Sequence, residues 1–308
     1  MISILLPLLL ILASPISTAP VSTATTDGDD DNNEADTVTS TLYSIWVEEN
    51  GADGNPDVFF ARSDDGGETF GDPINLSNND DWSTQPKIAV ADNHVHVVWL
   101  DSPSELDEGV RATVTVRSSD DGGETFGDPV LVSEREVGQP FSRLNILQID
   151  ATTTAADGND DDSNVYIGWV AGPGGQYAGR LNFARSDDSG QNFELLTGLV
   201  RGVDNIEMEV VASGSDKTDD RIYIAGQASS ENDITLAHQI FFVRSTDGGK
   251  TFDDPILLED ADPNEGDSIR FESMEVDDDQ IQVTWMNGYL EPRRTHFAVS
   301  VDGGETWG

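Results

Sequence analysis

The sequence predicts an all-β fold built from a four-stranded unit that recurs along the chain. The first observation is an acidic, glycine-rich phrase, SDDGGETF, which is written five times with variation between residues 63 and 307. The aspartates at its centre are 56, 67, 59 and 55 residues apart. The second observation is a set of strand-like runs between successive copies. A recurring period of this size indicates stacked repeats with a shared core, and four-stranded units are typical of the blades of a β-propeller.

Four short runs rich in β-forming residues make up each repeat. In the second repeat they read PKIAVA, HVHVVWL, ATVTVRS and DPVLVS, and we name them strands A, B, C and D in chain order. No convincing helix is evident. An obvious strand A is missing before the first repeat, and no strand D follows the last phrase. The sequence therefore predicts five antiparallel blades, three full and two partial, as an incomplete six-bladed wheel or a wheel with an unusual closure.

The recurring phrase, which we call the box, falls between strands C and D, where a tight turn is needed. Glycine can adopt the positive φ of such a turn, and short Ser and Asp side chains can bond to its backbone amides. We expect the closing aromatic residue to pack into the blade. We interpret the box as a structural joint rather than a catalytic site. Its key positions are Ser63, Asp65, Gly67, Phe70; Ser119, Asp121, Gly123, Phe126; Ser186, Asp188, Gly190, Phe193; Ser245, Asp247, Gly249, Phe252; Ser300, Asp302, Gly304, Trp307.

The pattern Ser-x-Asp-x-Gly-x-Thr-Phe/Trp resembles the Asp box, or bacterial neuraminidase repeat, of the sialidase superfamily. Four copies fit the pattern, and the third has Asn192 in the threonine position. The resemblance covers most of residues 40–308 and implies a six-bladed wheel. It also implies that the A–B and C–D turns share one face, while ligands meet the opposite rim, formed by the B–C and D–A connections. Boxes of this kind accompany several different activities.

Composition excludes several classes of function. The chain has 16 basic and 59 acidic residues, a formal charge of −43, and no cysteine. Disulfides, thiolate metal sites and cysteine nucleophiles are therefore excluded. A surface this acidic repels phosphate backbones and anionic headgroups, so we expect no nucleic-acid partner and no binding to membrane surfaces.

The N-terminal segment predicts export. Residues 2–13 form an apolar run of twelve, which is of signal-peptide length and short for a membrane span. We expect a signal peptide over residues 1–24, an acidic disordered spacer over 25–39, and the propeller over 40–308. The alternative is an uncleaved anchor. The prediction is a monomeric protein, secreted or at the cell surface, with no membrane insertion after signal cleavage.

Cationic residues are the candidate ligand-binding groups. Lys87, Arg143 and Arg270 stand near the start of strand A in three repeats, and the last B–C connection adds Arg293 and Arg294. Cations gathered at one rim can hold a carboxylate by charge-assisted hydrogen bonds. The alternative is that each of them neutralises a neighbouring Asp or Glu.

The resemblance to sialidases implies an arginine clamp and a tyrosine nucleophile. Arg143, Arg270 and Arg293 or Arg294 are the candidates for the clamp, and Tyr289 with Glu291 for the nucleophile and its activating glutamate. The departures are that no Arg-Ile-Pro motif precedes the first box, and that Tyr289 and Glu291 share one loop. No single aspartate stands out as the acid. A glycosidase that uses two carboxylates stays an alternative.

One acidic segment resembles the start of a calcium loop. Asp157, Asn159 and Asp161 alternate in DGNDDDSN, but Gly168 stands where a complete loop has a bidentate glutamate. We expect a solvated turn, with structural calcium as the alternative, and no other cofactor. His94 and His96 alternate on one strand without a further ligand, which predicts an exposed strand.

The tryptophans of strand B recur at one position, Trp46, Trp99, Trp169 and Trp285. This recurrence favours packing between blades over a sugar-binding platform. Taken together, the sequence predicts a non-catalytic module that binds a surface glycan or an extracellular protein. An exo-α-sialidase-like hydrolase is the first alternative, and a structural component of the cell envelope is the second.

Overall fold

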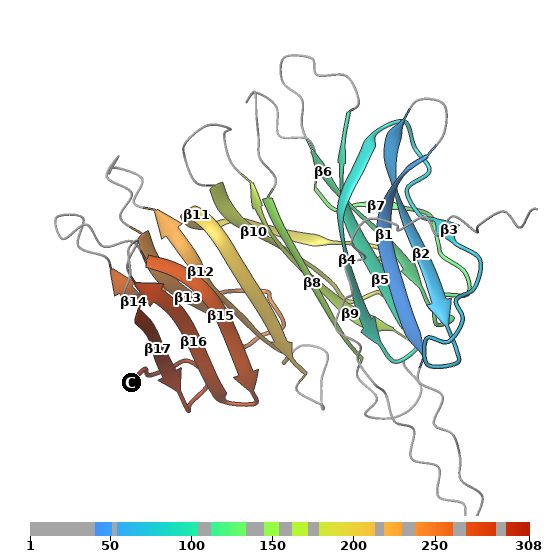
Figure 1. Cartoon of the computed structure of the whole chain (residues 1–308). Coiled ribbons are helices and arrows are strands. Elements are labelled where there is room, and N and C mark those ends of the chain that lie inside the picture. The colour runs from blue at the N-terminus through green and yellow to red at the C-terminus, as the bar shows by residue number, and fades with distance from the viewer. Residues whose placement is uncertain are drawn as a thin grey trace, which may run out of the picture.

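The computed structural model describes residues 41–50, 54–103, 112–133, 145–153, 162–171, 179–212, 219–229, 238–260, 269–287 and 294–308. These residues form seventeen β-strands and no helix, which confirms the all-β prediction. It follows that the described ranges contain no helix able to span a membrane. The strands form antiparallel blades that follow one another in chain order, from β1–β3 at one end of Figure 1 to β15–β17 at the other.

The five blades differ in how many strands the described residues contribute. Blade 1 has three, β1 (Leu42–Asn50), β2 (Asn55–Ser63) and β3 (Ile74–Asn75). Blade 2 has four, β4 (Trp82–Ala91), β5 (His94–Ser102), β6 (Thr113–Ser119) and β7 (Val130–Leu131). Blade 3 has β8 (Asn145–Thr153), β9 (Ser163–Ala171), β10 (Gly179–Ser186) and the first part of β11 (Glu194–Val211). Blade 4 has the second part of β11, β12 (Arg221–Ser229), β13 (His238–Ser245) and β14 (Ile256–Asp260). Blade 5 has β15 (Ile269–Asp277), β16 (Gln280–Asn287) and β17 (Arg294–Ser300).

Blades 3 and 4 share one continuous strand, where two separate strands were predicted. β11 pairs with β10 through its first part and with β12 through its second, so the two blades form a seven-stranded sheet. Gly202 lies at this transition with a φ of +77°, and a Cβ there would meet the Ser229 carbonyl oxygen at 2.1 Å. A glycine is therefore required where the strand passes from one blade to the next.

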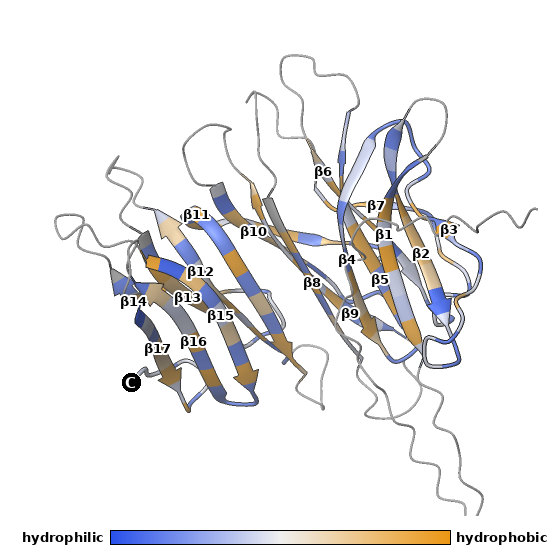
Figure 2. Ribbon diagram, in the orientation of Figure 1, coloured by the Kyte–Doolittle hydropathy of each residue, from blue (hydrophilic) through white to orange (hydrophobic). Residues whose placement is uncertain are grey.

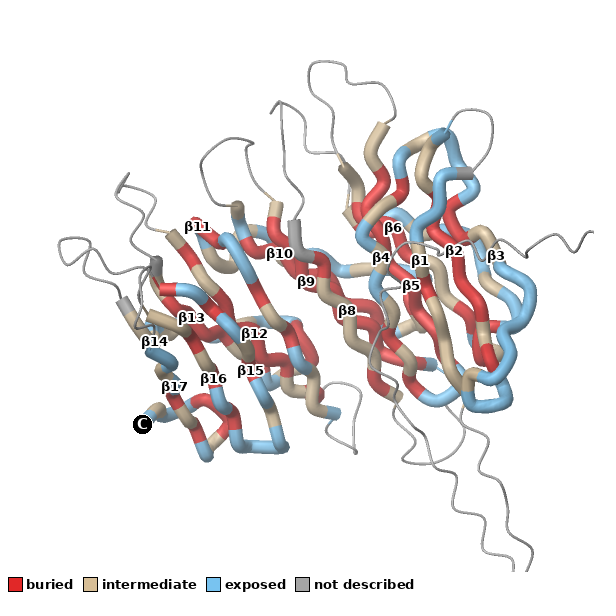
Figure 3. Tube along the Cα trace, in the orientation of Figure 1, coloured by how far each residue is buried: buried red, intermediate tan, exposed pale blue. Residues whose placement is uncertain are grey.

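Each hydrophobic cluster lies between two neighbouring blades. Trp99, Trp169 and Trp285 are at most 4% exposed, and each faces the preceding blade. Trp46, in the first blade, is partly buried and stacks on Phe59 with ring centroids 5.7 Å apart. The prediction that these residues pack between blades is confirmed for the three later ones. Figure 2 shows polar and apolar residues alternating along β15 and β16, and Figure 3 shows burial concentrated within the strands.

The prediction of an exposed strand at His94 and His96 is wrong. His94 is 7% exposed and His96 is fully buried. The His96 ring nitrogens lie 2.8 Å from the hydroxyls of Ser118, in the same blade, and Ser163, in the next. β5 lies inside blade 2, where neighbouring blades cover both of its faces, and a polar side chain there must find partners across the interface.

Candidate functional site

The five boxes fold into the same hydrogen-bonded turn. In the first, Ser63 Oγ donates to Asp65 Oδ1 and accepts from the Gly67 amide, both at 2.8 Å. Thr69 donates to the same carboxylate through its amide and its hydroxyl, at 2.8 and 2.6 Å. The other four boxes repeat these bonds. In the third box Asn192 Nδ2 replaces the threonine hydroxyl, 2.6 Å from Asp188.

These bonds keep the box carboxylates ionised. Bonds from Thr69 and Thr306 lower the pKa of Asp65 and Asp302, respectively, to about 2. Burial of Asp121 acts in the opposite direction, yet the bonds from Thr125 and Ser119 still bring its pKa to about 2. A carboxylate that holds no proton and already accepts several bonds serves a structural role rather than acid catalysis.

The closing aromatic residue packs against the preceding blade, where packing into its own blade was predicted. Three pairs meet edge to face with ring centroids 4.8–4.9 Å apart, namely Phe126 on Phe60, Phe252 on Phe183 and Trp307 on Phe242. The turn leans so closely on its neighbour that a Cβ at Gly123 would lie 2.6 Å from the Phe60 ring. The box is thus a joint between blades.

Arginines of the box face strengthen the same joints. Arg62, Arg185 and Arg244 each precede a box serine, and each donates to a glycine carbonyl of a box in the next blade, at 2.7–3.1 Å. Each also lies within 3.7 Å of two carboxylates. These cations are fully engaged in holding blades together.

The boxes and the A–B turns share one face of the molecule, as the resemblance implied. The Gly122 amide donates to the Asn93 carbonyl at 2.7 Å, and Gly303 donates to Asp279 at 2.9 Å. Asn93 and Asp279 are the turn residues between strands A and B of their blades. The B–C and D–A connections leave the opposite ends of the strands, so they form the other rim.

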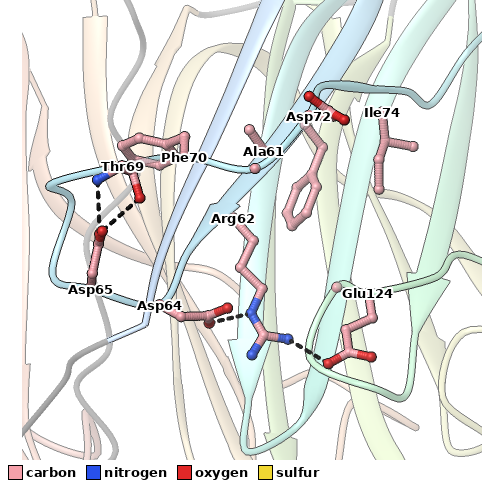
Figure 4. Close-up of a pocket in the computed structure, with 12 residues that line it drawn as sticks. Ala61, Arg62, Asp64, Asp65, Thr69, Phe70, Asp72, Ile74 and Glu124 are labelled. Atoms are coloured by element: carbon pink, nitrogen blue, oxygen red, sulfur yellow. Dashed lines mark hydrogen bonds and ion pairs between the residues drawn. The ribbon is translucent and has the colours of Figure 1, made fainter.

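A pocket of about 490 Å³ lies on the box face between blades 1 and 2 (Figure 4). Arg62, Asp65 and Thr69 line it, together with Phe70 and Glu124. Arg62 pairs with Asp64 and Glu124, and Asp65 accepts hydrogen bonds from Thr69. The guanidinium in this pocket is therefore already paired, and the exposed carboxylate of Asp72 also lines this cleft, which lies on the face where the sequence predicted no site.

The structure places three of the five predicted ligand-binding cations. Lys87, predicted near the start of strand A, lies instead within β4, opposite Val98, because the strand already begins at Trp82, and it is exposed. The Arg270 side chain is 73% exposed at the start of β15, with Nε 3.4 Å from Glu272 Oε1. Arg294, predicted in a loop, is the first residue of β17. The register joins Ile269, Asn287 and Arg294 across blade 5, so Arg270 and Arg294 lie at the same end, away from the box.

The other predicted site residues lie outside the described residues and stay predictions. They are the candidate catalytic pair Tyr289 and Glu291, the candidate clamp residues Arg143 and Arg293, and the candidate calcium ligands Asp157, Asn159 and Asp161. Among the residues that are described, no group of three or more His, Asp or Glu side chains is arranged to hold a metal ion.

Acidic residues of strand A link neighbouring blades, which sequence reasoning missed. Asp150 on β8 accepts a bond from the Val210 amide at 3.1 Å, and Glu207 on β11 accepts one from the Met274 amide at 2.6 Å. Burial raises the pKa of Asp150 to about 6. Partial burial, followed by the charges of Asp150 and Glu207, raises the pKa of Glu209 to about 7. These bonds identify Asp150 and Glu207 as links between blades. In the sequence alone they cannot be distinguished from surface carboxylates, because the amides that they bind belong to the next repeat.

Comparison with known proteins supports the fold. No protein-family model matches the chain, and no curated protein matches its sequence. An ulvan lyase from a new polysaccharide lyase family, bound to a unit of glucuronic acid and sulfated rhamnose, aligns with 86% of the chain at 13% identity and a TM-score of 0.50. The chain spans 63% of that lyase. An intramolecular trans-sialidase from Ruminococcus gnavus aligns with 84% of the chain at 14% identity and a TM-score of 0.47, over 77% of its own length. At 13% identity the likeness to the ulvan lyase is one of fold alone, and it agrees with the blades described above.

Proposed function

We propose that this protein is an exported carbohydrate-binding module, without catalytic activity, that holds an acidic glycan at the rim opposite the boxes. One observation carries the proposal. Lys87 and Arg294 have no carboxylate within ion-pair distance in the described part of the chain, and Arg270 is largely exposed. Exposed cations at this rim can hold the carboxylate of a ligand by charge-assisted hydrogen bonds.

The contrast between the two faces supports this assignment. On the box face Arg62, Arg185 and Arg244 are at most 24% exposed, and each has two carboxylate neighbours. At the opposite rim Arg270 and Arg294 lie at the same end of blade 5, and both are exposed, although the register places them on opposite faces of the sheet. Guanidinium groups in such a position suit the planar carboxylate of a uronic or sialic acid.

The ligand class is suggested by the structural neighbour. The ulvan lyase with the same fold was solved with a unit that contains glucuronic acid, a carboxylate-bearing sugar. We expect this chain to bind a related acidic saccharide on a cell surface or in an extracellular matrix. Surface carbohydrate also agrees with the export that the N-terminal segment predicts.

The proposal is tested by calorimetric titration of the full chain with oligosaccharides rich in glucuronic or sialic acid, and with neutral oligosaccharides of equal length. Binding of an acidic series is expected. Arg270→Ala and Arg294→Ala should each weaken it about tenfold or more, because each removes a charge-assisted bond. Lys250→Ala is the matched control, because it removes one exposed cation from the box face, and it should leave the affinity unchanged.

Turnover assays on the same oligosaccharides and on fluorogenic sialosides separate binding from catalysis. Affinity without turnover supports the module. Turnover that disappears in Tyr289→Phe would establish the sialidase-like alternative instead. If neither binding nor turnover is detected, or if Lys250→Ala weakens binding as much as the rim variants, the proposal is wrong.

A further inference from the structure

One tryptophan faces solvent, whereas the other five have structural partners. Trp99, Trp169 and Trp285 are buried, Trp46 stacks on Phe59, and Trp307 packs on Phe242. Trp82 is 47% exposed at the first position of β4. A single exposed apolar side chain is ordinary on a protein surface, so the case for a role of Trp82 depends on how its ring is held and where it lies.

The indole of Trp82 is held in place from its edge. Its Nε1 donates to Asn55 Oδ1 at 2.9 Å, and Asn55 Nδ2 donates in turn to the Asp80 carbonyl at 2.7 Å. Asn55 begins β2 of blade 1, so this bond joins two blades. The single polar atom of the ring is therefore satisfied within the protein, and the apolar surface of the ring is what remains to be covered.

The connection that carries Trp82 is fixed by a buried carboxylate. Asp101, 7% exposed, accepts from Asn79 Nδ2 at 3.2 Å and from Ser83 Oγ at 2.6 Å. Asn79 Oδ1 also accepts from the Asp81 amide at 2.8 Å. Residues on both sides of Trp82 are thus tied to one buried group. A platform held this way binds a ligand without the entropy cost of ordering a loop.

Trp82 lies on the rim to which the proposed function assigns the glycan. It pairs with Ser102, at the end of the hairpin opposite to Ala91 and His94, which flank the A–B turn. The boxes share the face of the A–B turns. Trp82 is therefore on the same rim as Arg270 and Arg294, but on blade 2 instead of blade 5.

We propose that Trp82 is a stacking platform for a neutral pyranose ring, which forms a second carbohydrate subsite on this rim. The inference rests on the proposed function, because it places a further sugar of the same ligand class. The partly positive C–H groups of a pyranose face pack on the negative face of the indole. The negative charge of the nearby Asp80 disfavours an acidic sugar at this position. Charge thus divides the rim into a neutral subsite at blade 2 and an acidic one at blade 5.

The test uses the full chain labelled with 5-fluorotryptophan, whose six fluorine signals report on each tryptophan separately. Trp82→Phe identifies the Trp82 signal. Cellohexaose, mannohexaose, chitohexaose and an acidic oligosaccharide that contains glucuronic acid are titrated in turn. We expect at least one of the three neutral hexasaccharides to shift the Trp82 signal and to leave the three buried tryptophans unmoved. Trp82→Ala should weaken that interaction about tenfold or more, with a smaller loss in Trp82→Phe.

Phe70→Ala is the matched control, because Phe70 is also 47% exposed but lies on the box face. It should leave saccharide binding intact, and thermal unfolding of each variant confirms that the fold is retained. If none of the neutral saccharides shifts the Trp82 signal, the proposed subsite is wrong. This also holds if a hydrophobic peptide, titrated as a further probe, shifts the signal and no saccharide does. If the acidic oligosaccharide binds through Arg270 and Arg294 but no saccharide shifts the fluorine signal of Trp82, only the proposed subsite is wrong. If neutral saccharides shift Trp82 but no acidic one binds, the assignment of an acidic glycan fails.

Discussion

Phe126 of the second box meets Phe60 of the preceding blade edge to face, with ring centroids 4.9 Å apart and planes inclined by 72°. The same edge-to-face contact occurs at two later joints. In the first and the last blade, one of the two corresponding aromatic residues is exposed instead. Phe70, the aromatic of the first box, is 47% exposed, and Phe297, at the position that corresponds to Phe60, is 63% exposed. One repeat position is therefore core in some blades and surface in another.

Two phenylalanines at the same repeat position should respond differently to truncation. Phe242 is fully buried against Trp307, whereas Phe297 is exposed. Phe242→Ala should lower the free energy of unfolding by about 3–5 kcal/mol because it leaves a cavity between blades. Phe297→Ala should change it by no more than about 0.5 kcal/mol. Chemical denaturation measures both, and equal losses would contradict the assignment of the joint.

The box carboxylates should stabilise the fold above their unfolded pKa. The folded pKa of Asp121 is about 2, below its unfolded value of about 3.9. Its contribution is therefore fully present above about pH 4 and is lost as the pH falls toward 2. Asp121→Asn should be less stable than the parent at neutral pH, and the two unfolding curves should converge at about pH 2. Parallel curves across the whole range would show that the charge of Asp121 does not matter.

Asp150 should give the opposite dependence of stability on pH. Its folded pKa is raised to about 6, so the folded state keeps the proton that the unfolded chain releases near pH 4. Stability due to this group is present at low pH and declines as the pH rises from about 4 to about 6, by at most about 3 kcal/mol. Asp150→Asn should flatten that part of the curve of unfolding free energy against pH. A variant with the parent's slope would place the titration elsewhere.

His96 should stay neutral well below the usual titration of histidine. Burial, and then the neighbouring His94, lower its pKa to about 3. Since the unfolded value is about 6.5, the stabilisation is complete above that pH and is lost as the pH falls toward 3. In nitrogen-15 NMR spectra the His96 ring signals should not move between about pH 8 and about pH 5, whereas a short histidine peptide titrates there. A His96 midpoint near that of the peptide would contradict the buried bridge between Ser118 and Ser163.

Features written in consecutive residues could be read without coordinates. Each box closes its hydrogen bonds within five residues, from Ser63 to Gly67 and from Asp65 to Thr69, so residue types and spacing predicted the turn. The alternation of apolar residues predicted the strands, and repetition of both predicted the blades. Burial of the strand-B tryptophans followed from the same repetition.

Other features depend on residues one repeat away, about which local patterns carry no information. Gly226 stands where other blades have tryptophan, and the structure leaves no gap there, because a Cβ would meet the Asn205 carbonyl oxygen at 2.0 Å. The buried ring of His96 has a hydrogen-bond partner in Ser163 of the next blade. The indole of Trp82 is held in place by a hydrogen bond to Asn55 of the previous blade. The sequence by itself therefore determined the repeating unit and the turn formed by each box, since those arise from short-range bonds. Only the tertiary structure decided which members of each repeated position are buried and which are offered to a ligand, because that depends on whether a neighbouring blade covers them.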